Sequence, residues 1–471
     1  MNKPLATLIG LALGVCASTA SAADLVEAYN LASESDPQLS AAENRLRAES
    51  ENVVQARANL LPQISGAGNF SEAERDQTAT QIISINPEII STSVSNAETF
   101  SRNWSLNLRQ SLYDHSNYTR LKASRSRASR AEADFVAARN DLMVRVADAY
   151  FAVLTTIETL ASSRAEERSV KRQLEQAEMR LEVGLSPITD VHEARARYDT
   201  ARANTIAAQN AYEDSLEALA EVTGTPLSGL RGLSPEFKPA LPEVTESEQW
   251  VKLALDNNPV LQARLLDLQA AHYDIATARA GHLPTLSASV DYSESGNTSD
   301  ISTGGILLPR SSSTSDGYSI GIRLDVPIFT GFATQSRVRQ AVSLRDASED
   351  QAEQQRRAVT RQTRNAFRAL IAGIAEVEAR RLAVVSATSA MEATEAGFEV
   401  GTRTIVDVLI SQQQLFGAQR EYALARNQFM VNSLRLKQSA GTISAEDVLA
   451  TNAQLVVDAE ALLAPEVERD F

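Results

Sequence analysis

The chain is poor in cysteine and in aromatic residues. Cys16 is the one cysteine among 471 residues, so no disulfide within the chain can staple the fold. Phe, Trp and Tyr together make up 5% of the residues, which favours helices packed through small side chains over a large globular core. The content of 43% hydrophobic and 22% charged residues indicates a folded protein rather than a disordered one.

Clustered positive charge and catalytic motifs are also missing. The formal net charge of −15 excludes a nucleic-acid groove, which needs concentrated Lys and Arg. The sequence has no Walker loop, no GxSxG elbow and no GxGxxG run, and its histidines lack metal-ligand spacing. These histidines are His115, His192, His272 and His282. We therefore expect no enzyme activity, no cofactor and no metal ion, so energy for any work that the protein does must come from a partner.

The N-terminus has the pattern of a cleavable secretory signal. Lys3 is followed by an apolar run over 5–15 and by small residues ending at Ala22, which predicts a signal peptide over 1–22. The exported chain then contains no thiol. Acylation of Cys16 is the alternative, but Val15 stands where a lipoprotein site requires a small residue. Beyond the signal no apolar run reaches the ~20 residues of a membrane-spanning helix, so a bilayer can be crossed only by a closed β-barrel.

The sequence contains two similar halves. The run RLEVGLSPITDV at 180–191 returns as GFEVGTRTIVDV at 397–408, and Gly224-Thr225 returns as Gly441-Thr442 at the same offset. This is a tandem duplication. We expect a first repeat over 23–224, a linker over 225–245, a second repeat over 246–441 and a C-terminal segment over 442–471; the resemblance described below implies that the linker and the C-terminal segment are equatorial.

Each repeat has the same order of expected elements. Helical segments of about 24–58 and 246–280 lead to strand pairs at 61–113 and 283–329. A long helix and a returning helix follow in each repeat, with tips near Gly184 and Gly401.

The expected strands alternate apolar and polar residues, which is typical of a sheet with two different faces. The alternation covers 102–112, 286–292 and 318–328, and is weaker over 63–70. A soluble sandwich also alternates, but strands of about ten residues with charged polar faces are typical of transmembrane β-strands. The polar stretches 71–98 and 294–316 are expected to be surface loops.

Two segments, 115–183 and 332–400, contain no proline. Each is expected to form an amphipathic helix of roughly 70 residues, on the order of 100 Å long. Such helices need partners to bury their apolar stripes.

The tips carry helix-ending signals. Gly184 is expected to end its helix in the left-handed conformation, with Ser186 as the next N-cap and Pro187 in the first turn. Gly401 with Thr402 or Thr404 repeats this arrangement.

Strand number constrains the assembly. Four membrane-spanning strands cannot close a barrel alone, because the edge strands would leave unpaired backbone groups facing lipid. A dimer would give eight strands and a barrel filled by side chains, whereas a trimer gives twelve strands and room for a pore. The trimer is favoured.

The sequence resembles the TolC family of outer-membrane efflux proteins over nearly the whole mature length. The resemblance rests on four runs in order: NVVQARANLLPQIS at 52–65, GLSPITDVHEARARYD at 184–199, ARAGHLPTL at 278–286 and VGTRTIVDVL at 400–409. It implies a mostly α protein with transmembrane β structure, in which a trimeric twelve-stranded barrel is continuous with a long α-helical barrel. The segments 225–245 and after Gly441 would build an equatorial collar.

The resemblance also implies a gate at the periplasmic end. Thr189, Asp190 and Arg403 match positions of the contacts that hold this end closed, and Asp407 matches an aspartate ring that narrows the entrance. Two positions depart from the pattern: Phe398 replaces a tyrosine that bonds the latch aspartate, and Ile410 replaces a second ring aspartate. The latch should therefore be weaker or differently built.

Simpler interpretations exist for these residues. Asp190 and Asp407 fall in the first turns of returning helices, where the helix dipole favours any carboxylate. Arg403 can be a solvated tip residue. Trp104, Tyr292 and Tyr318 can be ordinary strand aromatics or an interfacial girdle; the girdle is slightly favoured for Trp104.

The resemblance further implies partners and location. The tip residues Gly184, Leu185, Gly401 and Thr402 match the grooves where a periplasmic adaptor docks, and the adaptor connects to an inner-membrane transporter of the RND, ABC or MFS type. The protein would lie in outer-membrane lipid and extend into the periplasm. A stand-alone porin or receptor is the alternative, and a periplasmic coiled-coil scaffold without a pore leaves the two-faced strands unexplained.

Overall fold

The computed structural model describes residues 24–83, 89–234, 236–242 and 244–463. The expected signal peptide, including Cys16, and the end of the expected C-terminal segment lie outside the described residues. The helices and strands form two compact units by their internal contacts, and each unit draws on both halves of the chain. One unit contains 44–133 and 262–354, and the other contains the remaining residues.

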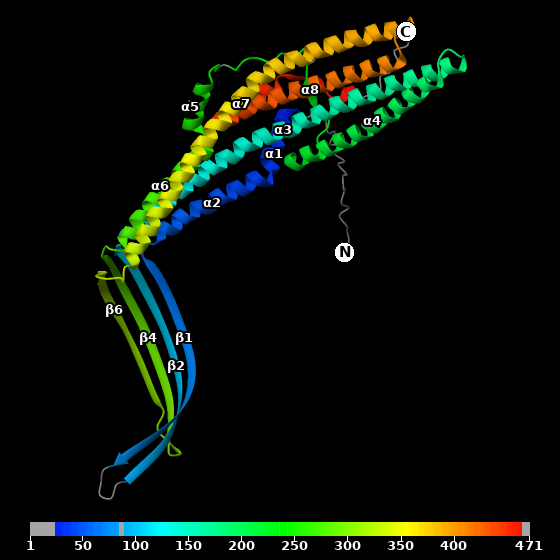
Figure 1. Ribbon diagram of the computed structural model, residues 1–471. Coiled ribbons are helices and arrows are strands. Elements are labelled where there is room, and N and C mark those ends of the chain that lie inside the picture. The colour runs from blue at the N-terminus through cyan, green and yellow to red at the C-terminus, as the bar shows by residue number, and fades with distance from the viewer. Residues whose placement is uncertain (1–23, 84–88, 235, 243, 464–471) are drawn as a thin grey trace, which may run out of the picture. The chain divides into compact units, whose positions relative to one another are not determined.

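The order of elements repeats along the chain (Figure 1). The first half contains α1 Leu25–Ser35, α2 Pro37–Ala58, β1 Gln63–Ile83, β2 Ile89–Tyr113, α3 His115–Glu182 and α4 Ile188–Thr223. The second contains α5 Ser247–Asn257, α6 Pro259–Ala280, β4 Thr285–Thr303, β5 Ile306–Leu307, β6 Ser311–Asp325, α7 Ala333–Glu399 and α8 Ile405–Ala440. The remaining elements are β3 Arg231–Leu233, α9 Ala445–Asn452, β7 Leu455–Asp458 and the 3-10 helix Glu460–Leu463.

The helical segments expected at about 24–58 and 246–280 are each interrupted, at Asp36 and at Asn258. A proline follows in both cases, and proline disfavours helical geometry in the residue before it. The break is capped in the same way in both halves: the Asp36 carboxylate accepts from the Leu39 amide at 2.8 Å, and the Asn258 side-chain oxygen accepts from the Leu261 amide at 3.1 Å. The aspartate is also held by Arg145, whose Nη2 lies 2.7 Å from Asp36 Oδ2.

In the unit that contains 44–133 and 262–354, β1, β2, β4 and β6 form an antiparallel sheet in that order. The strands are longer than expected, because the polar stretches 71–98 and 294–316, expected to be loops, are largely strand. Backbone pairing continues from Gln63↔Arg109 to Ile83↔Ile89. Ser and Thr tolerate the pleated conformation, and a strand needs an apolar face only where it packs or meets lipid, so loss of alternation does not end it.

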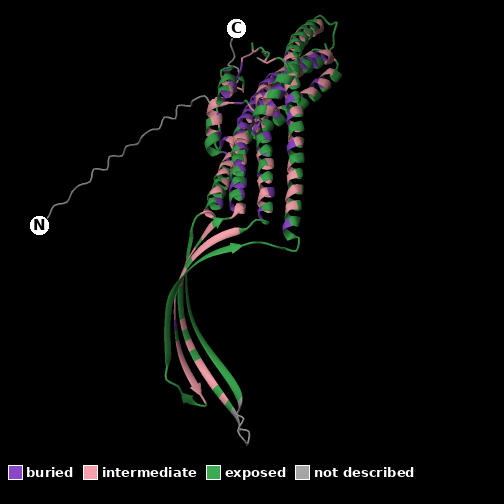
Figure 2. Cartoon of the chain, turned by 90° about the vertical axis from the view of Figure 1, so that its left-hand side faces the viewer, coloured by how far each residue is buried: buried purple, intermediate pink, exposed green. Residues whose placement is uncertain are grey.

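One face of this sheet carries the apolar residues. Directly paired positions include Leu286↔Leu324, Val290↔Ile320 and Tyr292↔Tyr318. The neighbouring pairs Leu106↔Tyr292 and Leu108↔Val290 extend the band onto β2. Its side chains remain exposed or half-buried in the single chain (Figure 2). We call this band the apolar belt.

The other unit has its core among helices (Figure 2). Its largest fully buried side chains include Tyr150 and Phe151 of α3 and Leu434 and Leu436 of α8. The Tyr150 hydroxyl donates to the Arg231 carbonyl oxygen at 2.9 Å and accepts from the Arg231 amide at 3.0 Å. Burial raises the pKa of Tyr150, so the phenol stays neutral and serves both bonds.

The short strands β3 and β7 pair antiparallel. The segment after α4 and the segment after α8, far apart in sequence, thus meet in a two-stranded sheet. None of the helices in the described parts of the chain is long and apolar enough to span a membrane.

Candidate gate at the hairpin tips

The first tip reverses the chain between α3 and α4. Gly184 has φ of 76°, a conformation that costs other residues free energy. Its amide donates to the Leu181 carbonyl at 2.9 Å, and the Leu185 amide donates to the Arg180 carbonyl at 2.8 Å. This pair of bonds is a Schellman motif, which satisfies carbonyls left open at the helix end. The sequence therefore determined where α3 stops.

The start of α4 differs from the prediction. Pro187 rather than Ser186 is the N-cap residue, with no side-chain capping bond, and the helix begins at Ile188. The expected serine cap is wrong: Ser186 lies one residue before the cap position, and its hydroxyl donates to Asp190 Oδ2 at 2.9 Å. One of the expected gate residues is thus held by its own tip.

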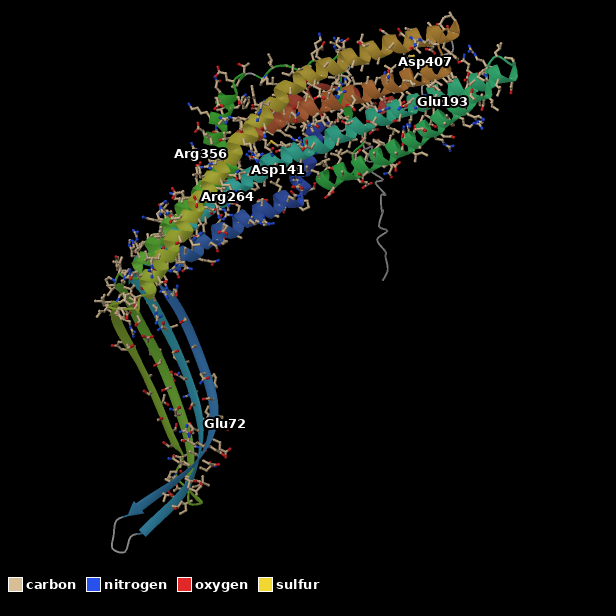
Figure 3. All side chains as sticks on the ribbon, in the orientation of Figure 1. Glu72, Asp141, Glu193, Arg264, Arg356 and Asp407 are labelled. Atoms are coloured by element: carbon tan, nitrogen blue, oxygen red, sulfur yellow. The ribbon has the colours of Figure 1, made fainter. Side chains whose placement is uncertain are left out.

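The second tip uses the same Schellman arrangement but a different cap. Gly401 has φ of 80°, and the Thr402 amide donates to the Gly397 carbonyl at 2.8 Å. Thr404 caps α8 through a capping box with Asp407, whose Oδ2 accepts from the Thr404 amide and hydroxyl at 2.9 Å each. Asp407 lies in the first turn of α8 (Figure 3).

These contacts set the charge of Asp407. The Thr404 backbone amide, then the Thr404 hydroxyl, and also the nearby Arg403 charge keep the pKa of Asp407 below its usual value. The carboxylate is therefore ionised at neutral pH in the single chain. Asp190, the equivalent residue of the first repeat, has a proline at the capping position and so has no such box.

The two tips pack against each other through a small apolar core. It includes Val170 and Leu174 of α3, Val191 of α4, and Ile405 and Leu409 of α8.

Phe398 lies against this core rather than at a carboxylate. It packs on the core partly buried, and the Arg180 guanidinium stacks over its ring at 4.5 Å. Such a cation–π contact adds modest stability at a partly exposed site. Phenylalanine cannot donate the hydrogen bond that tyrosine would, so the side chain instead joins α7 to α3.

Asp190 and Arg403, predicted to belong to a latch, form no ion pair in the described single chain. Thr189 and Arg403 are exposed, and Ile410 is exposed one turn beyond Asp407 on α8. Residues Leu185, 78% exposed, and Val400, 75% exposed, place apolar side chains at the two tips without a covering neighbour. The two tips thus leave Thr189, Arg403, Leu185 and Val400 exposed in the single chain, while Asp190 and Asp407 are bonded within their own tips.

The sequence profile described as outer membrane efflux protein matches residues 28–225 and again residues 250–442. The chain belongs to this family. Outer membrane protein TolC of Vibrio cholerae is 35% identical over 457 residues, which cover 97% of this chain and 99% of that protein. The alkaline protease secretion protein AprF of Pseudomonas aeruginosa is 27% identical, with 97% and 92% covered.

A solved structure has the same fold. The Campylobacter jejuni CmeC outer membrane channel superposes with a TM-score of 0.69 at 17% identity, covering 92% of this chain and 90% of that one. Members of the outer membrane efflux protein family are channels rather than enzymes. The protein is accordingly an outer-membrane channel of an efflux or secretion system.

Sequence reasoning missed the polar contacts between α3 and α8 in this family member. Glu158 Oε2 lies 3.0 Å from Arg426 Nη2, with 17% and 9% of the side chains exposed, and Arg420 bonds Glu166 at 2.9 Å. Burial raises the pKa of Glu158, against the opposing effect of Arg426. The sequence shows charges on both helices but not which of them face each other, because pairing depends on the antiparallel register of two distant segments.

The described residues contain no group of three or more His, Cys, Asp or Glu side chains that could hold a metal ion. The chemistry of the tips is instead that of caps, carboxylates and exposed apolar side chains.

Proposed function

We propose that three copies of this chain form one outer-membrane duct, with a twelve-stranded barrel continuous with a barrel of long helices. The observation that carries the proposal is the sheet with two open edges. Within the described residues β1 pairs only with β2, and β6 pairs only with β4 among the long strands. Because the apolar belt would face lipid, both edges must be satisfied by other copies.

The proposed trimer uses both repeats in the same way. Residues 23–224 and 246–441 each supply two strands and one helical hairpin, and the hairpins extend the cylinder into the periplasm. The linker 225–245 and the segment after Gly441, joined through β3 and β7, would form the collar around it.

We propose that the tips close this duct. Three copies of Asp407 would surround the axis at the narrow end, and like charges held close would attract cations. Thr189, Asp190 and Arg403 would meet a neighbouring protomer, because Thr189 and Arg403 are exposed in the single chain. With Phe398 turned to Arg180 and Ile410 uncharged, the closed state would be held by fewer polar contacts.

A periplasmic adaptor would dock at Gly184, Leu185, Gly401 and Thr402. The exposed Leu185 and Val400 support this proposal, because exposed apolar residues on a paired tip offer contact area to a helical partner. The inner-membrane transporter behind the adaptor would supply energy. The relative named for alkaline protease secretion supports a polypeptide cargo.

The test combines conductance with cross-linking. In a planar bilayer the intact protein should conduct weakly and be blocked by multivalent cations from the tip side. Ser186→Cys should cross-link to an adaptor in intact cells, whereas the control Asn210→Cys, on the exposed side of α4, should not. Wide conductance insensitive to cations would contradict a closed tip, and absence of an adaptor cross-link would favour a stand-alone porin.

A further inference from the structure

The returning helices of the two repeats occupy unequal environments. Gly184 recurs as Gly401, 217 residues later, and at this offset α3 corresponds to α7 and α4 to α8. Ile188 at the start of α4 is 57% exposed, whereas Ile405, the same residue at the start of α8, is 2% exposed. The single chain therefore covers a face of α8 whose counterpart on α4 stays open.

Helix α8 is covered by α3, which runs antiparallel to it. The Asn427 side-chain amide donates to the Thr155 hydroxyl at 3.0 Å, and Arg435 pairs with Asp148 at 2.9 Å. The position on α8 thus rises as the position on α3 falls. These contacts fix the register of the contact within one chain. Figure 1 shows the order α7, α8, α3 and α4 across these helices, so α7 and α4 are the outer two.

The open face of α4 forms a continuous row. Its residues recur every three or four positions, so they lie on one side of the helix, and each is exposed in the single chain. They are Asp199, Ala203, Ile206, Asn210, Glu213 and Glu217. We call this row the α4 stripe. At the offset of the repeat, its Asn210 is the counterpart of Asn427, which lies against α3.

Helix α7 has a matching open face. The α7 stripe consists of Arg368, Ala372, Ala375, Ala379 and Ala383, all exposed in the single chain. Ala372 is the counterpart of Thr155, the residue through which α3 meets Asn427. The two stripes are therefore the counterparts of the two surfaces that already pack on each other within the chain.

The stripes fit each other in size. When the register of α3 and α8 is carried over, Asn210 lies beside Ala372, and Ile206, one turn along α4, falls at Ala375. Ile206 is 64% exposed in the single chain, and small alanine side chains leave room for it. Within the chain the sizes are reversed: the counterpart Ala423 is small and 4% exposed, and the α3 residue at that level is the longer Glu158.

The stripes also fit in charge. Phe151 of α3 and Met430 of α8 belong to one buried apolar core, and their counterparts are Arg368 and Glu213. An apolar contact within the chain is thus matched by opposite charges on the two stripes, which favours their association. In the described chain both charges bond only neutral groups of their own helices: Glu213 accepts from Gln209 at 2.7 Å, and Arg368 donates to Asn365 at 2.6 Å and to a backbone carbonyl.

We propose that the α4 stripe of one copy binds the α7 stripe of the next copy, in the register that α8 and α3 adopt within one chain. The occupant is a second copy of this chain because isoleucine meets alanine and glutamate meets arginine at the same register. The inference rests on the proposed trimer and adds which helices meet and at which residues. This seam between copies carries accessible charges, whereas the seam within a copy carries the buried pair Glu158–Arg426.

Cysteine cross-linking tests the register. Asn210→Cys and Ala372→Cys are introduced together in one chain and treated with a short bis-maleimide in outer-membrane vesicles. We expect linked species of two and three chains. The matched control combines Asn210→Cys with Ala383→Cys, which lies on the same stripe about 16 Å further along the α7 axis, beyond the reach of the reagent. A control that links as well as the first pair, or a first pair that gives no linked chains, would overturn the register.

Charge reversal tests the pairing of Glu213 with Arg368. Arg368→Glu should slow cross-linking of the Asn210→Cys, Ala372→Cys pair by about threefold, as expected for an accessible ion pair, and Glu213→Arg should restore the rate. Added salt should slow the unreversed pair as well, because it screens accessible charges. The control is Arg381→Glu, on the other side of α7, where Arg381 pairs with Glu378 at 2.8 Å; its rate should stay unchanged. Failure of Glu213→Arg to restore the rate would contradict the pairing.

The number of chains separates this inference from the proposed duct. Native mass spectrometry of the same variants counts the copies in each assembly without relying on the helix contact. A monomer or dimer would end the proposed duct. A trimer in which the Asn210→Cys, Ala372→Cys pair does not link would leave the duct standing and remove this inference alone.

Discussion

Asp407 has two candidate roles that one pair of substitutions can separate. As a cap it accepts from the Thr404 amide and hydroxyl, and as a gate it would place a negative charge at the entrance. Asp407→Asn removes the charge but retains a side-chain oxygen that can accept from the Thr404 amide. Thr404→Ala keeps the charge but removes the hydroxyl that accepts from the Asp407 amide at 3.3 Å.

Thr404→Ala should change hydrogen exchange, whereas Asp407→Asn should change cation block. Loss of the N-cap threonine should cost about 1 kcal/mol of local helix stability, seen as faster amide hydrogen exchange in the first turn of α8, while cation block of conductance stays within about twofold. Asp407→Asn should leave exchange nearly unchanged and weaken block by divalent cations by about tenfold or more, since each protomer loses one charge.

The pH dependence follows from the lowered pKa of Asp407. A carboxyl whose folded pKa lies below its unfolded value stabilises the fold above the unfolded pKa and loses this contribution as the pH falls through the folded pKa. In the single chain the capping contribution of Asp407 should therefore persist at neutral pH and fade only in acid, below the usual range of an aspartate. If Thr404→Ala abolishes cation block as fully as Asp407→Asn, the block reflects tip order and the gating argument is refuted.

Three further predictions concern the tips and the contacts behind them. Ile410→Asp should lower conductance at neutral pH and increase sensitivity to divalent cations in bilayer recordings; an unchanged profile would show that this position does not face the lumen. Gly401→Ala should cost about 1 to 2 kcal/mol through its positive φ alone, because an added Cβ meets no atom within 4 Å; exchange at the tip should rise, and unaltered exchange would contradict the Schellman cap. Arg426→Met should destabilise the protein by about 3 to 5 kcal/mol, measured by thermal unfolding, because Glu158 would stay buried without its partner. The double variant Glu158→Met with Arg426→Met should recover most of this loss. A double variant as unstable as the single one would argue against the pair.

The elements governed by local patterns could be predicted from the sequence. The segments 115–183 and 332–400 are helices because they lack proline and repeat apolar residues at helical spacing, and α3 and α7 occupy nearly those ranges. Gly184 and Gly401 end these helices because only glycine adopts positive φ without cost.

Features that depend on which residues of the chain contact each other could not be predicted. The polar stretches 71–98 and 294–316 look like loops in the sequence. Their strands are held by backbone pairing, which requires no alternation of apolar and polar side chains. Ser186 was expected to cap α4, but the helix begins one residue later than expected, and the Ser186 hydroxyl donates to the Asp190 carboxylate instead of accepting from an amide. The Glu158–Arg426 pair depends on the register of two helices more than 200 residues apart in sequence.

Disulfide trapping across the open edges of the sheet tests the central claim most directly. One cysteine is introduced in β1 and one is scanned along β6 in the mature chain, which contains no other cysteine if the signal is cleaved as expected. If the edge strands of three copies pair to close one barrel, cross-linked species of two and three chains should form at one strand register, and none larger should form. A closed intramolecular bond, an open ladder beyond three chains, or no cross-link at any register would contradict the shared barrel.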